Sequence, residues 1–379
     1  MRYLGKIAMV VALASLTWGC DKATETTTEQ TTSATNEEPL SIIFMVGDGM
    51  GVPQVSSAFY FGDETPNFKQ FTSLGLSRTS SSNYLITDSA AGATAFSIGE
   101  KTYKRAIGVT TDTMPKATIL EDLKKQGYAT GLVSLTSITH ATPAAFYAHV
   151  ADRDMHEEIA KQLIDANIDF FAGGGKKFFN KRADGVNLLD SLLAKNYKLD
   201  TVSLGKADFS KPNAYILADD ELPNKIQGRG DYLPDATKTA LDYFEAQNKP
   251  FFMMVEGSFI DWGGHAENDT MMIKEVLDFD KTIGVVLDYV NKHPNTLVVI
   301  TADHETGGAS IGKYYKTGAD GKKQEVKDKV QIYFHDNQHS TELVPVFAKG
   351  KGEELFRGIY ENNEIYHKFF KALNTTTNE

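Results

Sequence analysis

The sequence predicts an α/β fold in which a mostly parallel central sheet is sandwiched between helices. From residue 40 onward, short β-branched or aromatic runs alternate with stretches of helical period, the pattern of strand–helix–strand units. Charged side chains follow three of these runs, at residues 42–46, 251–255 and 297–301. Because ligands bind at the carboxyl ends of strands in open α/β sheets, these side chains also predict where the site lies.

The remaining elements follow in chain order. Residues 118–126 are predicted to form a helix ended by Gly127, and residues 129–133 form the next strand. Pro143 suits the first turn of a helix that continues through Asp152. Helical periodicity also predicts helices at residues 155–166, 235–248 and 271–291, and the polar stretch at 313–329 predicts an exposed hairpin or loop.

A run of three glycines at residues 173–175 could be mistaken for a phosphate-binding loop. It lacks the Lys-Ser/Thr pair of such a loop and no clear helix start follows it. We therefore expect a plain turn at these glycines.

Composition and charge restrict the class of protein. The chain has 379 residues, 41% of them hydrophobic, and a net charge of -11. No Lys/Arg cluster is present, which argues against specific nucleic-acid binding.

The amino-terminal segment predicts export. Residues 1–20 have a basic start and an apolar stretch too short to span a bilayer, which is typical of a signal peptide. Cys20 is the only cysteine, and residues 16–20 are similar to a lipoprotein cleavage box, so a lipid anchor on Cys20 is expected over simple secretion. Residues 21–39 predict a disordered tether and residues 40–379 a single domain, in a periplasmic or secreted protein that touches a membrane only through this anchor.

Four separated clusters carry the candidate chemistry. Asp48 lies between two glycines, where the backbone can approach a ligand closely. Ser89 precedes a helix of small residues whose first amide groups would favour negative charge near its oxygen, although a serine there is commonly only a helix cap.

The other two clusters combine carboxylates with imidazoles. Asp261 and His265 are four residues apart, on one helical face, although the two glycines between them suggest a loosened turn. Asp303 and His304 are adjacent, so both reach one metal only if the preceding strand has already ended. His339 adds an imidazole, and such a set without thiolates suits a catalytic zinc site.

In combination these clusters resemble the alkaline phosphatase family from about residue 40 to the C-terminus. The resemblance implies a phosphate monoesterase of broad specificity that uses two zinc ions and one magnesium ion, and in which Ser89 is phosphorylated during turnover. It implies that the first zinc is bound by Asp261, His265 and His339, and the second, beside Ser89, by Asp48, Asp303 and His304. It also implies that the magnesium is bound by Asp48, Thr142 and Glu256, and that Arg153 contacts the phosphoryl oxygens.

Two positions depart from the best-known bacterial members. His140 stands where many of them have Asp, and Trp262 replaces a polar residue, a pairing that resembles enzymes of cold-environment bacteria. We expect His140 to lie beside the metal ligands and Trp262 to line the substrate entrance, and the departure leaves the identity of the third metal open. The family is mostly dimeric, so a homodimer is expected, with residues 313–329 as one candidate contact.

Three other functions are weighed against this one. A sulfatase would need a proline and an arginine after its nucleophile, and neither follows Ser89. A phosphodiesterase usually has threonine as its nucleophile and lacks the matching arginine and magnesium ligands. A surface lipoprotein that captures phosphate or metal would need no nucleophile at the centre of the ligand set.

Overall fold

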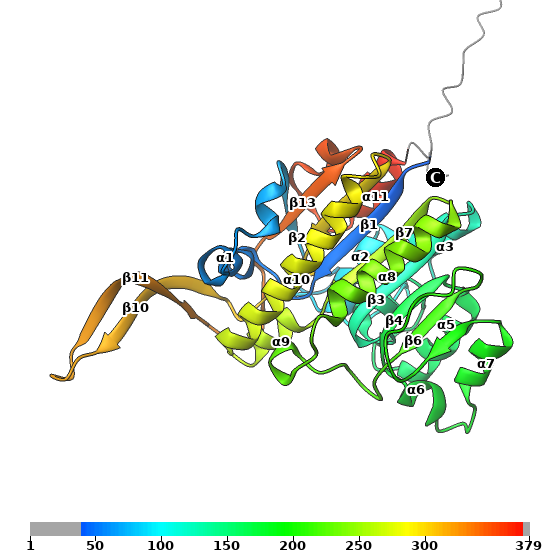
Figure 1. Cartoon of the computed structure of the whole chain (residues 1–379), viewed down its shortest axis with the longest axis horizontal. Helices are drawn as coiled ribbons and strands as arrows, with labels where there is room; N and C mark the ends of the chain where they lie inside the picture. The colour runs from blue at the N-terminus through cyan, green and yellow to red at the C-terminus, as the bar shows by residue number, and fades with distance from the viewer. Residues whose placement is uncertain (1–38, 374–379) are drawn as a thin grey trace, which may run out of the picture. The chain divides into compact units, whose positions relative to one another are not determined.

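A ten-stranded sheet forms the framework, in the order β14-β2-β13-β8-β1-β7-β3-β4-β6-β5 (Figure 1). β13 alone among the ten runs antiparallel to its neighbours, so the prediction of a mostly parallel sheet is confirmed. The strands are β1 (Ser41–Gly47), β2 (Ser73–Arg78), β3 (Ala129–Ser137), β4 (Phe170–Gly174), β5 (Lys198–Asp200), β6 (Asn213–Ile216), β7 (Phe251–Gly257), β8 (Thr296–Thr301), β13 (Val344–Gly350) and β14 (Gly358–Glu361).

Helices cover both faces of this sheet, with α8 and α10 across the near face in Figure 1 and α2, α3 and α11 behind it. The helices are α1 (Val52–Phe61), α2 (Ser89–Ile98), α3 (Ile119–Lys125), α4 (Ala141–Ala144), α5 (His156–Ala166), α6 (Lys177–Asn180), α7 (Leu188–Ala194), α8 (Tyr232–Gln247), α9 (Phe259–His265), α10 (Asp269–Val290) and α11 (Glu364–Ala372), with 3₁₀ turns η1 (Asn67–Gln70), η2 (Lys225–Gln227) and η3 (Glu353–Phe356).

This computed structural model describes residues 39–373, which belong to one compact unit, Glu38–Glu379. The predicted signal segment, Cys20 and all of the predicted tether except its last residue lie outside the described residues. Within residues 39–373, no helix has both the length and the apolar character needed to cross a membrane.

The central strand β1 supplies both halves of the core. Side chains alternate along a strand, so Phe44 faces one helical layer and its neighbour Met45 the other. Phe44 packs edge-on against Phe96 of α2 at 5.3 Å and Phe369 of α11 at 5.2 Å between ring centroids. A strand buried on both faces reads as a continuous apolar run, as residues 42–46 do.

Most of the predicted helices are confirmed, with ends that move by a few residues. α3, α5, α8 and α10 correspond to the helices predicted at 118–126, 155–166, 235–248 and 271–291. The helix predicted from Pro143 through Asp152 is wrong, because α4 ends at Ala144. Its continuation instead pairs with a distant segment through an antiparallel bridge between Val150 and Ile107.

The glycines at 173–175 are also different from the prediction. Gly173 and Gly174 lie in the buried strand β4, and only Gly175 has a left-handed backbone, with φ 95°. A Cβ on Gly174 would lie 2.0 Å from the carbonyl oxygen of Asp220, so the glycine is required by a close backbone approach and not by a turn.

The polar stretch at residues 313–329 forms a hairpin, as predicted. Strands β10 (Ser310–Thr317) and β11 (Lys323–Tyr333) pair antiparallel and project away from the body in Figure 1. At the base of the hairpin, β9 (Glu305–Thr306) pairs with β12 (His339–Ser340). The hairpin therefore begins and ends beside candidate metal ligands.

Candidate active site

The register of the central strands brings three separated carboxylates to one edge of the sheet. Val46 of β1 lies opposite Glu256 of β7 and Thr301 of β8. Asp48 and Asp303 each follow two residues beyond these paired positions, where the strands have ended. The sequence-predicted position of the site, at the carboxyl ends of parallel strands, is therefore what the structure has.

Ser89 lies within a group of potential metal ligands. The Nε2 atom of His304 is 3.4 Å from Oδ1 of Asp48, 3.3 Å from Oδ2 of Asp303 and 3.3 Å from Oγ of Ser89. All four side chains are almost fully buried. One nucleophilic oxygen thus shares a small buried space with two carboxylates and an imidazole.

A second group consists of Asp261, His265 and His339. Nε2 of His265 is 3.1 Å from Nε2 of His339 and 3.4 Å from Oδ1 of Asp261, and the His339–Asp261 distance is 3.5 Å. Ligands about 2.0 to 2.1 Å from a tetrahedral zinc would lie about 3.4 Å from each other, so the spacing fits one small cation.

The helix that carries two members of this group, Asp261 and His265, is more regular than expected. Asp261 and His265 lie in α9, which continues through Gly263 and Gly264 without loosening. A Cβ on Gly263 would lie 2.6 Å from Cα of Met272, so the missing side chains let α9 pack directly on α10. The expectation of a loosened turn is therefore corrected.

The two groups touch through their imidazoles. The rings of His304 and His339 stack with centroids 3.5 Å apart. Ligand atoms of Asp261, His304 and His339 also lie within 4.8 Å of one another, as do those of Asp48, Asp303 and His304. His304 thus lies between the two groups; the resemblance implies that it binds the second zinc, and that assignment stays a prediction.

The electrostatics of the site favour cations. Burial, followed by the charge of Asp303, raises the pKa of Asp48 well above its usual range, and burial followed by the charge of Asp261 raises the pKa of Asp303 to about 7. Burial lowers the pKa of His304 well below its usual range, so its imidazole is neutral and able to bind metal. Oδ1 of Asp48 and Oδ2 of Asp303 are buried without a hydrogen-bond partner, which a bound cation would supply.

A third set of oxygen donors consists of Glu256, Thr142 and Asp48. Glu256 is the penultimate residue of β7, and burial raises its pKa although Ser134 donates a hydrogen bond of 2.6 Å to Oε2. Its Oε1 and the Oγ1 of Thr142, in the adjacent helix α4, are buried without hydrogen-bond partners. Together with Asp48 these oxygen donors suit a hard cation such as magnesium.

Asp88 supports both the nucleophile and the arginine. It is the N-cap of α2, accepting from the Ala91 amide at 3.2 Å, so Ser89 is the first helical residue and not the cap. Its Oδ2 accepts from Nη1 of Arg153 at 3.2 Å. The other terminal nitrogen of Arg153 is 3.3 Å from Nε2 of His140, whose pKa is lowered well below its usual range by burial and then by the arginine's charge.

Trp262 is partly buried. Its ring packs on that of Phe259, the first residue of α9, with centroids 4.6 Å apart. Its side chain therefore lies on the same short helix as two of the candidate zinc ligands, and its role at the substrate entrance stays a prediction.

The family model for alkaline phosphatase matches residues 40–324 and 313–375. The chain belongs to the alkaline phosphatase family. It is therefore a hydrolase of phosphate monoesters that binds metal ions, as the resemblance implied.

Several alkaline phosphatases are similar over nearly the whole chain. Alkaline phosphatase 3 of Bacillus subtilis is 32% identical, covering 97% of this chain and 96% of that protein, and the Escherichia coli enzyme is 29% identical over 90% and 87%. The structure of alkaline phosphatase from the Antarctic bacterium TAB5 is 43% identical with a TM-score of 0.86, covering 90% of this chain and 99% of that chain. A TAB5 variant with histidine replaced by aspartate has magnesium in its M3 site.

Some residues of this alkaline phosphatase site were missed from the sequence. Thr306 donates to Oδ1 of Asp261 at 2.5 Å and lies 3.2 Å from Nδ1 of His304, so it orients one ligand of each group. Its position two residues after His304 could have indicated this role. Ser134 holds Glu256 from the neighbouring strand, and nothing in its own sequence surroundings indicates that contact.

Proposed function

We propose that the chain hydrolyses phosphate monoesters with broad specificity through a phosphoserine on Ser89. The observation that carries the proposal is the position of Ser89 Oγ, 3.3 Å from Nε2 of His304 and inside the group formed with Asp48 and Asp303. Two zinc ions and one magnesium ion held by the three ligand groups would supply the positive charge that favours a serine alkoxide, stabilises the leaving oxygen and activates water.

Ser89 is suited to attack by its place at the start of α2. The ten-residue helix directs its first amide groups toward the serine, and these groups favour negative charge. In the first half-reaction the serine oxygen bonds to phosphorus, the ester P–O bond breaks, and the alcohol leaves after taking up a proton. In the second, water attacks the phosphoserine, inorganic phosphate leaves and the serine hydroxyl is restored.

Arg153 is suited to hold the transferred group. Its side chain is 17% exposed, and both terminal nitrogens have partners on the protein, Asp88 and His140, that fix the plane of the guanidinium. A fixed guanidinium offers two parallel N–H donors to phosphoryl oxygens, which the single ammonium of lysine cannot do.

Replacing the nucleophile tests the proposal. Ser89→Ala should lower turnover of an aryl phosphate by about 10³-fold or more, because it removes the hydroxyl that would form the covalent intermediate. Metal analysis of the purified variant should still find metal ions, since the carboxylates and imidazoles are unchanged. A variant that keeps its turnover would refute the phosphoserine and favour a module that only binds phosphate or metal.

Comparison of two substrates tests the reaction class. An aryl phosphate monoester should be hydrolysed faster than the corresponding diester, because the guanidinium of Arg153, which Asp88 holds, would pair with free phosphoryl oxygens, and a diester has one fewer of them. A preference for the diester would place the enzyme with the phosphodiesterases.

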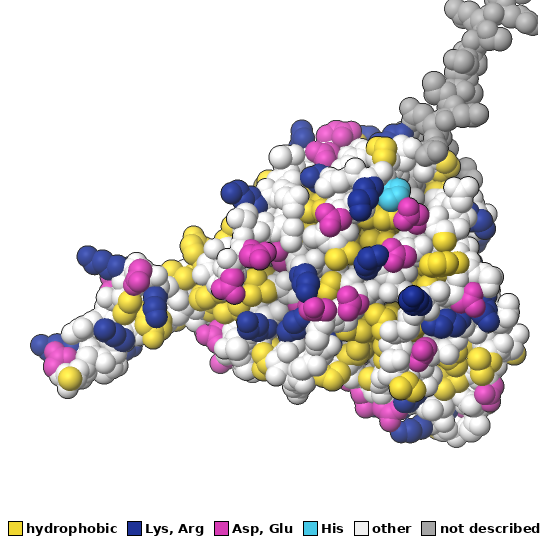
Figure 2. Space-filling model, viewed as in Figure 1, with side chains coloured by type: hydrophobic (Ala, Val, Ile, Leu, Met, Phe, Trp, Pro, Cys, Tyr) yellow, Lys and Arg dark blue, Asp and Glu magenta, His cyan; other side chains and the backbone are white. Residues whose placement is uncertain are grey.

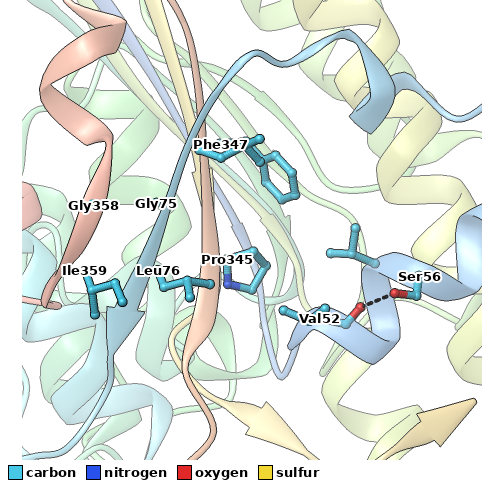
Figure 3. Close-up of a pocket in the computed structure, with 10 residues that line it drawn as sticks. Val52, Ser56, Gly75, Leu76, Pro345, Phe347, Gly358 and Ile359 are labelled. Carbon is cyan, nitrogen blue, oxygen red and sulfur yellow. Dashed lines mark hydrogen bonds between the residues drawn. The ribbon is translucent and has the colours of Figure 1, made fainter.

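We infer that the protein is a homodimer that buries an apolar groove beside α1. The groove, about 430 Å³, is lined by Val52, Leu76, Pro345, Phe347 and Ile359 among others, from α1 and the strands β2, β13 and β14 (Figure 3). Figure 2 shows hydrophobic side chains around α1, where the hairpin leaves the body.

The exposure of this surface supports a second copy as its occupant. The exposed fractions are 51% for Leu74, 70% for Ile359 and 63% for Tyr60, which is high for large apolar side chains. A two-fold contact covers the same patch on both copies at once. Light scattering should give a dimer that Leu74→Glu dissociates, while Val202→Glu, at another exposed apolar residue, leaves it intact. A monomer in the unmodified protein would contradict the inference.

For its location we propose the periplasm or the exterior, with a lipid on Cys20. The basic and apolar segment at residues 1–20 supports export. Expression of the full chain in a bacterial host should leave activity in the membrane fraction, and Cys20→Ser should release it. Activity that stays soluble in both cases would contradict the lipid anchor.

A further inference from the structure

Arg105 has a backbone conformation that its side chain does not favour. Its φ is 77°, in the left-handed region where residues with a long side chain are strained. Arg105 lies in the segment between α2 and the Ile107–Val150 bridge, which places it across from the loop that carries Arg153.

The side chain of Arg105 binds both neighbours of Arg153. Its Nε donates to Oδ2 of Asp152 at 2.8 Å and its Nη2 donates to Oδ1 at 2.8 Å, while the same Nη2 also pairs with Asp154. Asp152 in turn accepts from the amide of Asp154 at 2.9 Å. The ion pair with Arg105 lowers the pKa of Asp152 to about 2, so this carboxylate stays charged at neutral and alkaline pH.

The backbone of Arg105 completes the link. Its carbonyl oxygen accepts from the amide of Arg153 at 2.9 Å, and its own amide donates to Oδ1 of Asp88 at 3.1 Å. Oδ2 of Asp88 accepts from Nη1 of Arg153. Arg105, Asp88 and Arg153 therefore form a closed ring of hydrogen bonds beside the nucleophile helix.

The ion pair of Arg105 with Asp152 contributes little to the free energy of unfolding. The side chains of Arg105 and Asp152 are each 44% exposed, and ion pairs this exposed contribute little to the free energy of unfolding. The left-handed backbone acts against that contribution.

We propose that Arg105 is a positioning residue for Arg153. By holding Asp152 and Asp154, it fixes the loop on both sides of Arg153, so that the guanidinium of Arg153 faces the phosphoryl oxygens bound at Ser89. The proposal rests on the proposed role of Arg153 in holding that group.

The substitution Arg105→Gly separates positioning from stability. It removes the side chain and suits the left-handed backbone, so the unfolding temperature of the metal-loaded enzyme should stay the same or rise. KM for an aryl phosphate and the inhibition constant of inorganic phosphate should rise about 3- to 10-fold, with kcat changed less than about 2-fold, because the contact is made in both the ground state and the transition state. Amide hydrogen exchange at residues 150–155 should become faster.

Changing the two aspartates that Arg105 binds tests whether Arg105 acts only through its positive charge. The double variant Asp152→Asn, Asp154→Asn also weakens the contacts of Arg105 with these residues, but it makes the charge around Arg153 more positive. If Arg105 acted only through its charge, this variant would bind phosphate more tightly, whereas positioning predicts weaker binding. Arg105→Lys, which offers one donor nitrogen in place of the planar guanidinium, should give an intermediate effect.

A matched control is Lys238→Ala, which breaks an exposed ion pair with Asp242 on α8 and should change nothing. Arg153→Ala tests the proposed role of Arg153 in holding the phosphoryl group. An unchanged inhibition constant of phosphate in this variant would refute that role and, with it, the positioning role of Arg105. If Arg153→Ala weakens phosphate binding but Arg105→Gly does not, only the positioning role is refuted. Should Arg105→Gly fail to fold, the Asp152→Asn, Asp154→Asn variant decides alone: tighter phosphate binding overturns the proposal and weaker binding supports it.

Discussion

Removing one buried carboxylate should stabilise the metal-free protein. Asp303 is fully buried, and burial followed by the charge of Asp261 raises its pKa from 3.8 to about 7. The difference is about 3 units, and each unit corresponds to 1.36 kcal/mol, so the charged side chain costs on the order of 4 kcal/mol. We expect Asp303→Asn to recover most of that free energy of unfolding at pH 8 when no metal is bound.

The stability gained by Asp303→Asn in the metal-free protein depends on pH. Since the folded-state pKa is raised, the unfolded chain loses this proton first, and stability falls as pH rises from about 4 through about 7. The raised pKa values of Asp48 and Glu256 act in the same direction. The pKa of His304 is lowered, so its contribution to the free energy of unfolding is present above pH about 6.5 and is lost as pH falls. This contribution is common to wild type and Asp303→Asn. The gain from Asp303→Asn should therefore be near zero at pH 4 and complete at pH 8.

The substitution fits the site without leaving new unpaired groups. Oδ1 of Asp303 accepts from the amides of Gly49 at 3.3 Å and His304 at 3.1 Å, and the amide oxygen can keep both bonds. The new side-chain nitrogen would replace Oδ2, which is 3.3 Å from Nε2 of the neutral His304 and can receive a donated hydrogen there. Steric and hydrogen-bonding losses are thus small beside the electrostatic gain.

Urea unfolding at pH 4, 6 and 8, with chelator present, measures the effect. With zinc and magnesium restored, the order should reverse, because wild type keeps a ligand that Asp303→Asn lacks. A metal-free variant less stable than wild type at pH 8, or a difference that is the same at pH 4 and pH 8, would refute the reasoning.

Three further outcomes are expected. Trp262→Ala should raise KM for an aryl phosphate more than for a small alkyl phosphate, and unchanged steady-state kinetics for both would remove Trp262 from the entrance. His140→Asp should tighten magnesium binding in a metal titration because a carboxylate is a hard oxygen ligand, and an unchanged affinity would separate this position from the third metal. Phe44→Ala should lower the free energy of unfolding by about 3 to 5 kcal/mol, measured with urea, because it opens a cavity between Phe96 and Phe369, and a loss below about 1 kcal/mol would contradict that packing.

The sequence predicted the fold class and the edge of the sheet at which the candidate metal ligands lie. Residues 42–46, 251–255 and 297–300 are apolar throughout because these central strands are buried on both faces, and the charged residues follow at or just beyond the end of each run. This local signal sufficed to place Asp48, Glu256 and Asp303 together. Which cation each group holds depends on the ions themselves and stays a proposal.

Errors arose where a distant contact outweighed a local preference. Pro143 lies in a first helical turn as expected, but that helix begins at Ala141 and ends at Ala144. Val150 pairs instead with Ile107, a contact between segments far apart in the sequence. Gly263 and Gly264 suggested a loosened turn, yet their missing side chains serve the packing of α9 on α10 and on Thr306. The contacts of Arg105 are of the same kind, since they require the loop at Asp152 to fold back onto it.

The pairing of β9 with β12 separates the projecting arm, strands β10 and β11, from the candidate metal ligands. Thr306 lies opposite His339 and Glu305 opposite Ser340. The two ends of the arm are therefore held together by β9 and β12, beside the imidazoles, before β10 begins. Lengthening the arm beyond that closure costs little, about 0.6 kcal/mol for each doubling of a flexible loop. Insertions between residues 317 and 323, at the tip, should therefore be tolerated, which leaves the arm open to evolutionary variation or to a grafted domain.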